Sequence, residues 1–486
     1  MQKIKKIMFA IPNDRWFERR HWNNFPYTLG ILAAVLKDKY EVEILDASLE
    51  DLGEEEIKKR IEKSRPDVVG ISCLSMEYTL HFQKMAELVK SVSKEIKVVV
   101  GGIYPTLLPT AILGNHNIDF VVIGEGEYRF PKLLKYLEDP VSNAIREIDG
   151  LAYRLNGDVI VQPLETYITN LDNIPLPYYE IFDIEKYMNQ ASPYSYYTRP
   201  NRFPVAFTIT SRGCPFNCVF CSSKAINGLS IRYRSAENVL KEIDLLVQKY
   251  GIKEIIFYDD NFFLNRERLI KILNGLVERN YDLEWKTVNA AVYALDEELV
   301  ELMKKSGCYQ IALAIESGTK EGLELMRKPF PEKILSNAPR IAKKARSLGM
   351  DITGLFIIGI PGETWEMIRE TLKFADGLDL DYCSFNIATP LPATDLYKTA
   401  KEKNLLPEDF DFNALDFKGF GRATITTNEF TPEELQILRA FEWDRINFKT
   451  PEKIARIAKM HGLTIEEIQN WRKSTRRGLG VKVRYK

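Results

Sequence analysis

The chain has 486 residues, of which 45% are hydrophobic and 28% are charged, and 67 Lys and Arg residues nearly balance 68 Asp and Glu residues. This composition is typical of a globular protein and excludes a collagen-like, low-complexity or wholly disordered chain. The length predicts about two to four domains, and the near-zero net charge argues against a protein that acts mainly by binding nucleic acid. No apolar run is long enough to span a bilayer and no signal-peptide cleavage site is present, so we expect a cytoplasmic protein without a membrane span.

Residues 1–140 alternate between short apolar runs, such as IKKIMFAI, DVVGISC and IKVVVGG, and amphipathic stretches with helical spacing. Short β-branched runs separated by helices predict parallel strands joined by right-handed crossovers. The fold class expected here is therefore α/β, with a doubly wound, Rossmann-like parallel sheet. In such sheets ligands bind at the carboxyl ends of the strands.

The remaining chain divides into three expected segments. Residues 141–200 are rich in Pro and Tyr and predict an irregular connector. Residues 201–400 contain six further βα units, which favour a partial (β/α)6 barrel over a second flat sheet. Residues 401–486 look helical and end in a basic tail, which we interpret as a solvated terminus or as a contact for an anionic group.

Three of the six cysteines, Cys214, Cys218 and Cys221, lie in the segment ITSRGCPFNCVFCS with the spacing C-x3-C-x2-C. Three thiolates on one short loop can ligate three corners of a 4Fe-4S cluster. A zinc site would need a fourth ligand, and the nearest downstream histidine is His461. The spacing therefore predicts an iron–sulfur cluster with one open iron, which suits direct binding of a small molecule.

This loop resembles the hallmark of the radical S-adenosylmethionine (SAM) superfamily, CxxxCxφC, in which φ is aromatic. Three later strand ends, YDDNFF, ALAIESG and GLFIIGIPGET, are similar to the family's other motifs and follow in the same order. The resemblance implies that these segments contact the methionyl amine, the ribose and carboxylate, and the adenine of SAM. The matching residues are Phe220, Asp259, Asp260, Asn261, Glu316, Ser317, Gly318, Gly354, Gly359, Pro361, Gly362 and Glu363.

A radical SAM region preceded by a doubly wound domain resembles the cobalamin-binding class of that superfamily. GGIYPTLLP and DFVVIGEGE are similar to the segments which that class places at strand ends over the corrin. Ordinary tight βα turns would explain the same glycines. The resemblance implies the cobalamin-binding residues Ser72, Ser75, Gly101, Gly102, Gly124, Glu125 and Gly126, with Cys73, Met76, Trp16, Trp22 and Tyr27 as further candidates.

Many cobalamin domains carry DxHxxG, whose histidine ligates cobalt, but here the first strand runs into PNDRWFERRHWNNFP without that motif. We therefore assign no histidine to cobalt. The departure is consistent with cobalamin bound without a histidine beneath the metal, or with a domain that has lost cobalamin.

The resemblance implies a cobalamin-dependent radical SAM enzyme that methylates an unactivated carbon through a 5′-deoxyadenosyl radical and methylcobalamin. Its cofactors would be a 4Fe-4S cluster, SAM and cobalamin, and no catalytic side chain is assigned. We expect a small-molecule or lipid substrate, an external electron donor such as flavodoxin or ferredoxin, and no nucleic acid. The alternatives are a radical SAM cyclase or rearrangement enzyme, a methylthiotransferase that modifies RNA, and a non-enzymatic sensor.

Overall fold

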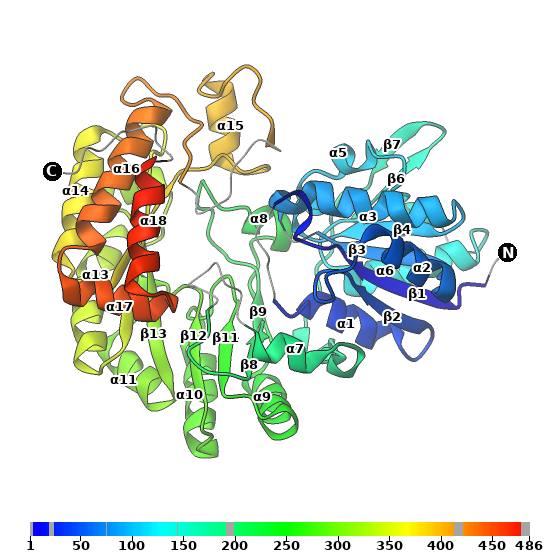
Figure 1. Ribbon diagram of the computed structural model, residues 1–486, viewed down its shortest axis with the longest axis horizontal. Coiled ribbons are helices and arrows are strands. Elements are labelled where there is room, and N and C mark those ends of the chain that lie inside the picture. Colours follow the sequence, from blue (N-terminus) through cyan, green and yellow to red (C-terminus); the bar gives the residue numbers. More distant parts are fainter. Residues whose placement is uncertain are drawn as a thin grey trace. The chain divides into compact units, whose positions relative to one another are not determined.

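The structure is a computed structural model that describes residues 3–18, 24–73, 75–142, 144–190, 199–412 and 421–477. The chain packs into two compact units (Figure 1). The first unit comprises Met1–Tyr194 and Ala225–Arg234, and the second comprises Ser195–Lys224 and Ser235–Lys486. The short segment that follows the cysteine loop therefore packs with the N-terminal unit.

The first unit is built on a seven-stranded sheet with the order β2-β1-β3-β4-β5-β6-β7. Its first five strands are parallel, and helices cover both faces, with α1 packed against α6 and α2 against α3. This confirms the doubly wound sheet expected from the alternating pattern. The strands are β1 (Lys6–Ile11), β2 (Glu41–Asp46), β3 (Val68–Ser72), β4 (Lys97–Gly101), β5 (Phe120–Val122), β6 (Leu151–Leu155) and β7 (Asp158–Val161).

The amphipathic stretches of this unit form its helices. The α-helices are α1 (Tyr27–Leu36), α2 (Glu54–Ser64), α3 (Thr79–Val92), α4 (Ile103–Leu107), α5 (Pro109–Leu113), α6 (Gly126–Glu138) and α7 (Ile184–Asn189). The short 3-10 helices are η1 (Trp16–Glu18), η2 (Met76–Tyr78), η3 (Ile145–Glu147), η4 (Leu171–Asn173) and η5 (Tyr179–Ile181).

The expectation of an irregular segment over residues 141–200 was wrong for part of that range, because β6 and β7 form an antiparallel hairpin at the edge of the first sheet. Asn156 and Gly157 form its turn, with φ of 52° and 92°. An Asn-Gly pair between two short apolar runs is a strong hairpin signal, since both residues tolerate positive φ. The signal was present in the sequence and outweighs the prolines that follow.

The second unit contains a six-stranded parallel sheet with the order β15-β14-β13-β12-β11-β8. The six strands lie side by side in the order in which they follow one another along the chain, as in a partial (β/α)6 barrel that is open between its first and last strands. The strands are β8 (Val205–Thr208), β11 (Glu254–Phe257), β12 (Glu284–Thr287), β13 (Cys308–Glu316), β14 (Asp351–Ile358) and β15 (Tyr382–Ile387). Between β8 and the first long helix lie β9 (Ser211–Arg212), α8 (Ser223–Asn227) and β10 (Arg232–Tyr233).

Helices follow the strands of this sheet in sequence, and the helices predicted beyond residue 400 are present up to Arg477. They are α9 (Ala236–Tyr250), α10 (Arg266–Arg279), η6 (Val292–Ala294), α11 (Glu297–Lys305), α12 (Lys320–Leu325), α13 (Pro331–Ser347), α14 (Trp365–Gly377), α15 (Asp395–Glu402), α16 (Pro432–Asn447), α17 (Pro451–His461) and α18 (Ile465–Arg477). Residues 478–486 of the basic tail lie outside the described residues. Among the helices of the described residues, none combines the length and apolar character needed to cross a membrane.

Candidate active site

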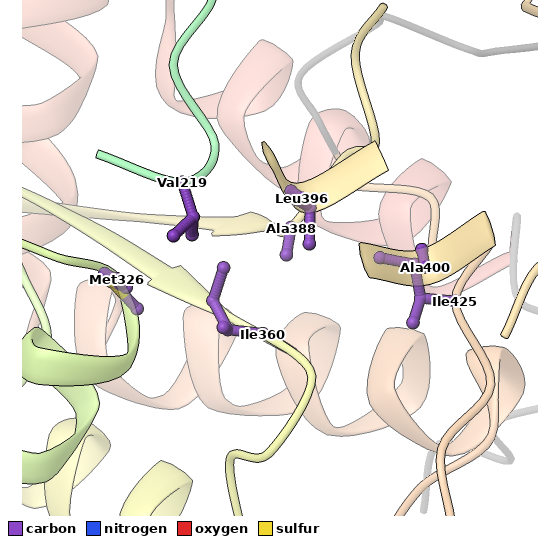
Figure 2. Packing of buried hydrophobic residues seen from close by; sticks show 7 residues of the cluster. All are labelled: Val219, Met326, Ile360, Ala388, Leu396, Ala400 and Ile425. Carbon is purple, nitrogen blue, oxygen red and sulfur yellow. The ribbon is translucent and has the colours of Figure 1, made fainter. Parts of the chain in front are cut away.

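The cysteine loop begins after β8, at the carboxyl end of the second sheet. Its residue Val219 is held on two sides, because its N–H donates to the Met326 carbonyl at 3.1 Å and its carbonyl accepts the N–H of Leu396 at 2.8 Å. The Val219 side chain belongs to a buried apolar group that we call the loop-anchor cluster (Figure 2), and Phe220 packs against it. The cluster consists of Val219, Met326, Ile360, Ala388, Leu396, Ala400 and Ile425.

The thiols of this loop lie close enough to interact electrostatically with one another. Burial raises the pKa of Cys218, and it raises the pKa of Cys221 to about 11 even though the Cys221 residue is open to solvent. Because the thiolate is the form that binds metal, cluster assembly must release protons from these groups.

The donor set fits an iron–sulfur cluster better than a single ion. Within the described ranges, no group of three His, Cys, Asp or Glu side chains is arranged to hold one metal ion. In a cubane cluster each thiolate binds a different iron, so its ligands are farther apart than the ligands of one ion. Three thiols on one loop, with one of them open to solvent, suit that arrangement.

The acidic strand end after β11 contains two residues with different surroundings. The buried Asp259 accepts hydrogen bonds from the N–H and hydroxyl of Thr210, at 3.1 and 2.7 Å, and from the Ser211 hydroxyl. Burial raises the pKa of Asp259 despite these donors. Asp260 is exposed and accepts a hydrogen bond from Ser223 at 2.7 Å. Asp259 therefore holds the start of the cysteine loop.

Asn261, the third residue of that strand end, faces the first cysteine. Its amide nitrogen lies 3.9 Å from Cys214 Sγ and donates to the Tyr293 hydroxyl at 2.9 Å. Its carbonyl oxygen is buried and has no hydrogen-bond partner among the described residues. A buried acceptor without a donor is costly, so this oxygen suits a ligand that donates, such as an ammonium group. The residues present therefore fit SAM beside the cluster.

The end of β13 contains Glu316, Ser317 and Gly318. Glu316 adopts a left-handed backbone conformation with φ of 70° and pairs with the Lys328 ammonium at 3.1 Å. The Ser317 hydroxyl lies 3.0 Å from that of Thr371 in α14, and the Gly318 N–H donates to the same Thr371 oxygen at 3.0 Å. Through these hydrogen bonds, Ser317 and Gly318 attach the end of β13 to α14.

The turn after β14 is closed by Glu363. One oxygen of this buried carboxylate accepts the N–H groups of Gly359 and Ile360, at 2.6 and 3.2 Å, and the other is buried without a partner in the described part of the chain. Burial raises the pKa of Glu363 to about 7. Gly359 and Gly362 have φ of 88° and 96°, which other residues adopt only at a cost. Gly354 faces Leu380 and Phe356, which leave no space for a side chain.

In the first unit, the predicted glycines after β4 lie against the loop after β3. Cys73 donates its N–H to the Gly101 carbonyl at 2.9 Å, and a Cβ at Gly102, where φ is 108°, would collide with the Cys73 backbone. Ser72 ends β3, and the Ser75 hydroxyl accepts the N–H of Glu77 at 3.3 Å. The close packing of the turns after β3 and β4 is therefore enough by itself to require glycine at position 102.

The GEGE segment forms a buried ion pair that sequence reasoning did not expect. Glu125 accepts hydrogen bonds from Arg232 at 2.6 Å and from the Ile168 N–H at 2.8 Å, and both charged side chains are almost fully buried. Gly124, with φ of 70°, donates its N–H to Thr106, and Gly126 begins α6. The Glu125 carboxylate, expected to accept bonds from corrin amides, is therefore occupied by protein donors.

The further cobalamin candidates are placed as follows. Cys73 is buried, which raises the pKa of its thiol, and Met76 is also buried. The Trp16 carbonyl is bound by His81 at 2.6 Å, and the Tyr27 hydroxyl by Arg234 at 3.1 Å. Trp22 lies outside the described residues.

Four large apolar side chains at the carboxyl-terminal edge of the first sheet are exposed. One follows each of the strands β1, β3, β4 and β5. Exposed apolar groups gathered at a ligand-binding edge are consistent with a large, flat ligand such as a corrin. They are Phe17 (49% exposed), Leu80 (50%), Ile103 (41%) and Tyr128 (52%).

Sequence reasoning missed several residues that contact the predicted ones. Arg232, Tyr293 and Thr371 are 107, 32 and 54 residues from Glu125, Asn261 and Ser317, and Lys328 is 12 residues from Glu316. Of these four residues, Lys328 alone had a local signal, a short stretch rich in charge and Pro that predicts a turn.

Two family models match the chain: the Radical SAM superfamily over residues 208–375 and the B12 binding domain over residues 24–134. These matches coincide with the open parallel barrel and the doubly wound sheet. Fold and site together define a radical SAM enzyme that has a B12-binding domain.

Curated relatives identify the family. An uncharacterized methyltransferase of Pyrococcus horikoshii is 36% identical over 408 residues, which are 83% of this chain and 85% of that protein. Cytidylyl-2-hydroxyethylphosphonate methyltransferase of Streptomyces wedmorensis is 31% identical over 467 residues, 86% of this chain and 85% of that protein. The chain belongs to the cobalamin-dependent radical SAM methyltransferase family.

Two solved structures share the fold. The methyltransferase TsrM of Kitasatospora setae matches with a TM-score of 0.73 and 17% identity over 99% of both chains. The radical enzyme OxsB matches with a TM-score of 0.74 and 18% identity over 98% of this chain and 72% of that one. Family membership confirms the enzyme class and the three expected cofactors, a 4Fe-4S cluster, SAM and cobalamin.

Proposed function

We propose that this enzyme transfers a methyl group to an unactivated carbon of a small-molecule or lipid substrate. When bound, the cofactors supply the reactive chemistry, since reductive cleavage of one SAM provides a 5′-deoxyadenosyl radical and cobalamin carries the methyl group of another. The protein contributes binding, orientation and exclusion of water.

The carbonyl oxygen of Asn261 is buried without a hydrogen-bond partner among the described residues, and the amide nitrogen of the same side chain lies 3.9 Å from Cys214 Sγ; this observation supports the proposal most directly. We assign this oxygen to the ammonium group of SAM and the cysteines Cys214, Cys218 and Cys221 to the cluster. Glu316 has a second carboxylate oxygen that can accept a ribose hydroxyl, and we assign the turn at Gly359 to the adenine. We assign the exposed apolar edge of the first sheet to the corrin.

The test uses anaerobically reconstituted protein. We expect about four irons per chain, as in a single cubane cluster, and one corrinoid after incubation with hydroxocobalamin. Reduction with dithionite should release 5′-deoxyadenosine from SAM, and the Cys218→Ala variant should not release it. Zinc in place of iron, or no corrinoid at saturating hydroxocobalamin, would contradict the proposal.

The products distinguish the alternative functions. A methylase forms S-adenosylhomocysteine as well as 5′-deoxyadenosine, whereas a cyclase or rearrangement enzyme forms only the latter. A methylthiotransferase would need ligands for a second cluster, and about eight irons would favour it. The remaining cysteines, Cys73, Cys308 and Cys383, are each buried, which argues against that function.

We also propose that the enzyme works in the cytoplasm with an external one-electron donor such as flavodoxin or ferredoxin. Reduction of SAM consumes an electron that the chain's own residues cannot supply. Purified donor proteins can be compared by the rate at which the enzyme forms 5′-deoxyadenosine with each of them. The same rate with NADPH and no donor protein would contradict the need for an external one-electron donor.

A further inference from the structure

The amide of Asn261 has contacts at its nitrogen end that its oxygen end lacks. The nitrogen donates to the Tyr293 hydroxyl at 2.9 Å and lies 3.9 Å from Cys214 Sγ. The carbonyl oxygen is buried, and the described residues include no hydrogen-bond partner for it. An asparagine amide carries two N–H donors at one end and an acceptor at the other. The two contacts can therefore use both donors and leave the oxygen to a ligand.

The two neighbours of the amide nitrogen differ in what they can accept or donate. A tyrosine hydroxyl can do either, so Tyr293 by itself would tolerate both orientations of the Asn261 amide. As a cluster ligand, Cys214 is a thiolate, which only accepts hydrogen bonds, and it favours the orientation in which the nitrogen faces the sulfur. Tyr293 then accepts the second N–H and holds the amide in that orientation.

Tyr293 itself has a fixed position beside the cysteine loop. It lies in η6, its side chain is buried, and its ring packs edge-on against Phe216 of that loop, with the ring centroids 5.6 Å apart. The side-chain amide of Asn337 in α13 donates to the carbonyls of Val292 and Leu295, at 3.3 and 3.0 Å, and so holds the backbone on both sides of Tyr293. A hydroxyl held in this way can orient a neighbouring side chain.

We propose that Tyr293 is a positioning residue for SAM. Together with Cys214 it takes up the N–H donors of Asn261, and it thereby directs the carbonyl oxygen of that amide toward the SAM ammonium. Without the hydroxyl the amide can turn, and its N–H groups would then face a cation. The proposal rests on the SAM site of the proposed function and adds to it a residue outside the motifs that resemble those of the family.

The test compares SAM with an analogue in which hydrogen replaces the α-amino group and the rest of the molecule is unchanged. Affinities are measured by equilibrium dialysis on reconstituted protein whose iron content has been determined. Tyr293→Phe removes the hydroxyl and keeps the ring. It should weaken SAM binding roughly three- to tenfold, as expected for loss of one hydrogen bond, and leave the affinity for the analogue within about twofold.

Tyr309→Phe is the matched control. It also removes a hydrogen-bonded hydroxyl, which donates to Glu254 at 2.6 Å, but it lies at the amino end of β13, whereas the cysteine loop lies at the carboxyl end of the same sheet. This variant should change neither affinity.

A double-mutant cycle separates positioning of the amide from mere support of the loop. In the Asn261→Ala background, Tyr293→Phe should cause no further loss of SAM affinity, because no amide remains to be oriented. Three outcomes would overturn the proposal: equal losses for SAM and the analogue, a loss that persists in the Asn261→Ala background, or an unchanged SAM affinity in iron-loaded Tyr293→Phe.

If Tyr293→Phe does not take up a cluster, replacement of Tyr293 by 4-aminophenylalanine decides. The amino group is close to the hydroxyl in size but is a poor acceptor, because its lone pair is delocalised into the ring. The preference for SAM over the analogue should therefore still fall, and an undiminished preference overturns the assignment. Failure of SAM to bind the unmodified protein would instead reject the proposed function itself.

Discussion

Neighbouring polar residues at the strand ends of the second unit have different tasks. Asp259 and Glu363 accept hydrogen bonds from the loops that follow β8 and β14, so their carboxylates hold the backbone in place. In the part of the chain that the structure describes, the buried carbonyl oxygen of Asn261 has no hydrogen-bond partner. Asp259 is bound by protein donors and supports the site, whereas one oxygen of Glu363, like that of Asn261, is buried without a hydrogen-bond partner among the described residues.

Glu363 should make stability depend on pH. Its pKa rises from its ordinary value of 4.5 to about 7 in the folded protein, so the folded state holds its proton more tightly and loses stability as pH increases through this range. The shift corresponds to about 3 kcal/mol. Glu363→Gln should therefore be more stable than the unmodified protein at pH 8 and similar to it at pH 4.5, as measured by the Tm without SAM. A Tm difference that does not change with pH would contradict the assignment.

Asn261→Ala should weaken SAM binding about tenfold, because the ligand loses a buried acceptor for its ammonium. Iron content should remain that of the unmodified protein, since Asn261 is not a thiolate ligand. Equilibrium dialysis and iron analysis check both expectations. Loss of iron with unchanged SAM affinity per cluster would show that Asn261 only supports Cys214.

At the scale of elements, two contacts position the cysteine loop and the segment after it. The loop-anchor cluster packs Val219 among residues that follow β14 and β15 and residues of α15 (Figure 2). The segment Ala225–Arg234, which begins four residues after Cys221, packs within the first unit through the Arg232–Glu125 pair. Both contacts are buried, so removing one partner from either should cost more stability than breaking a surface pair.

Arg232→Met should destabilise the first unit by about 3–5 kcal/mol, because it leaves the Glu125 carboxylate buried without its cation. The double variant with Glu125→Gln should be less destabilised, since no unpaired charge remains. Arg202→Met breaks the more exposed pair with Asp282 and is the control, with a much smaller expected cost. Equal urea midpoints for the two single variants would exclude a special role of the buried pair.

Leu396→Ala should cost about 2–5 kcal/mol, because it removes a side chain that is 2% exposed from the loop-anchor cluster. Since Leu396 also donates its N–H to Val219, we expect faster loss of the cluster absorbance under air as the cavity loosens the loop. Thermal unfolding and absorbance decay measure these two effects. Lys398→Ala, at a surface position of the same helix, should change neither.

At the scale of the whole molecule, the chain folds into two compact units. A ligand that binds one unit stabilises that unit by mass action and leaves the other unchanged unless the two are coupled. The proposed functions are divided in the same way, with the corrin on the first unit and the cluster with SAM on the second.

Calorimetry with hydroxocobalamin should therefore shift one unfolding transition, by about 2.7 kcal/mol at a concentration of 100 times Kd. SAM should shift the other, and only in protein that retains its cysteines. Cys218→Ala is the control that should abolish the SAM shift and leave the cobalamin shift intact. One transition that responds equally to both ligands would show that the units unfold together.

Much of the fold was predictable, because hydrophobic spacing is local. The six βα units expected over residues 201–400 correspond to the six strands of the second sheet. The hairpin at Asn156 and Gly157 was missed although its signal was local. The ion pair of Glu125 with Arg232 had no local signal, since 107 residues separate its members.

The sequence by itself determined the cofactor chemistry, because the spacing of Cys214, Cys218 and Cys221 along one loop does not depend on distant residues. Only the tertiary structure decided which polar groups of the motifs remain available. Asp259 and Glu125 are occupied by partners from other elements, whereas the buried carbonyl oxygen of Asn261 has no hydrogen-bond partner among the described residues. Folding brings those partners together and removes the water that would otherwise form hydrogen bonds with each polar group. Whether a polar group is available to a ligand is therefore a property of the folded chain.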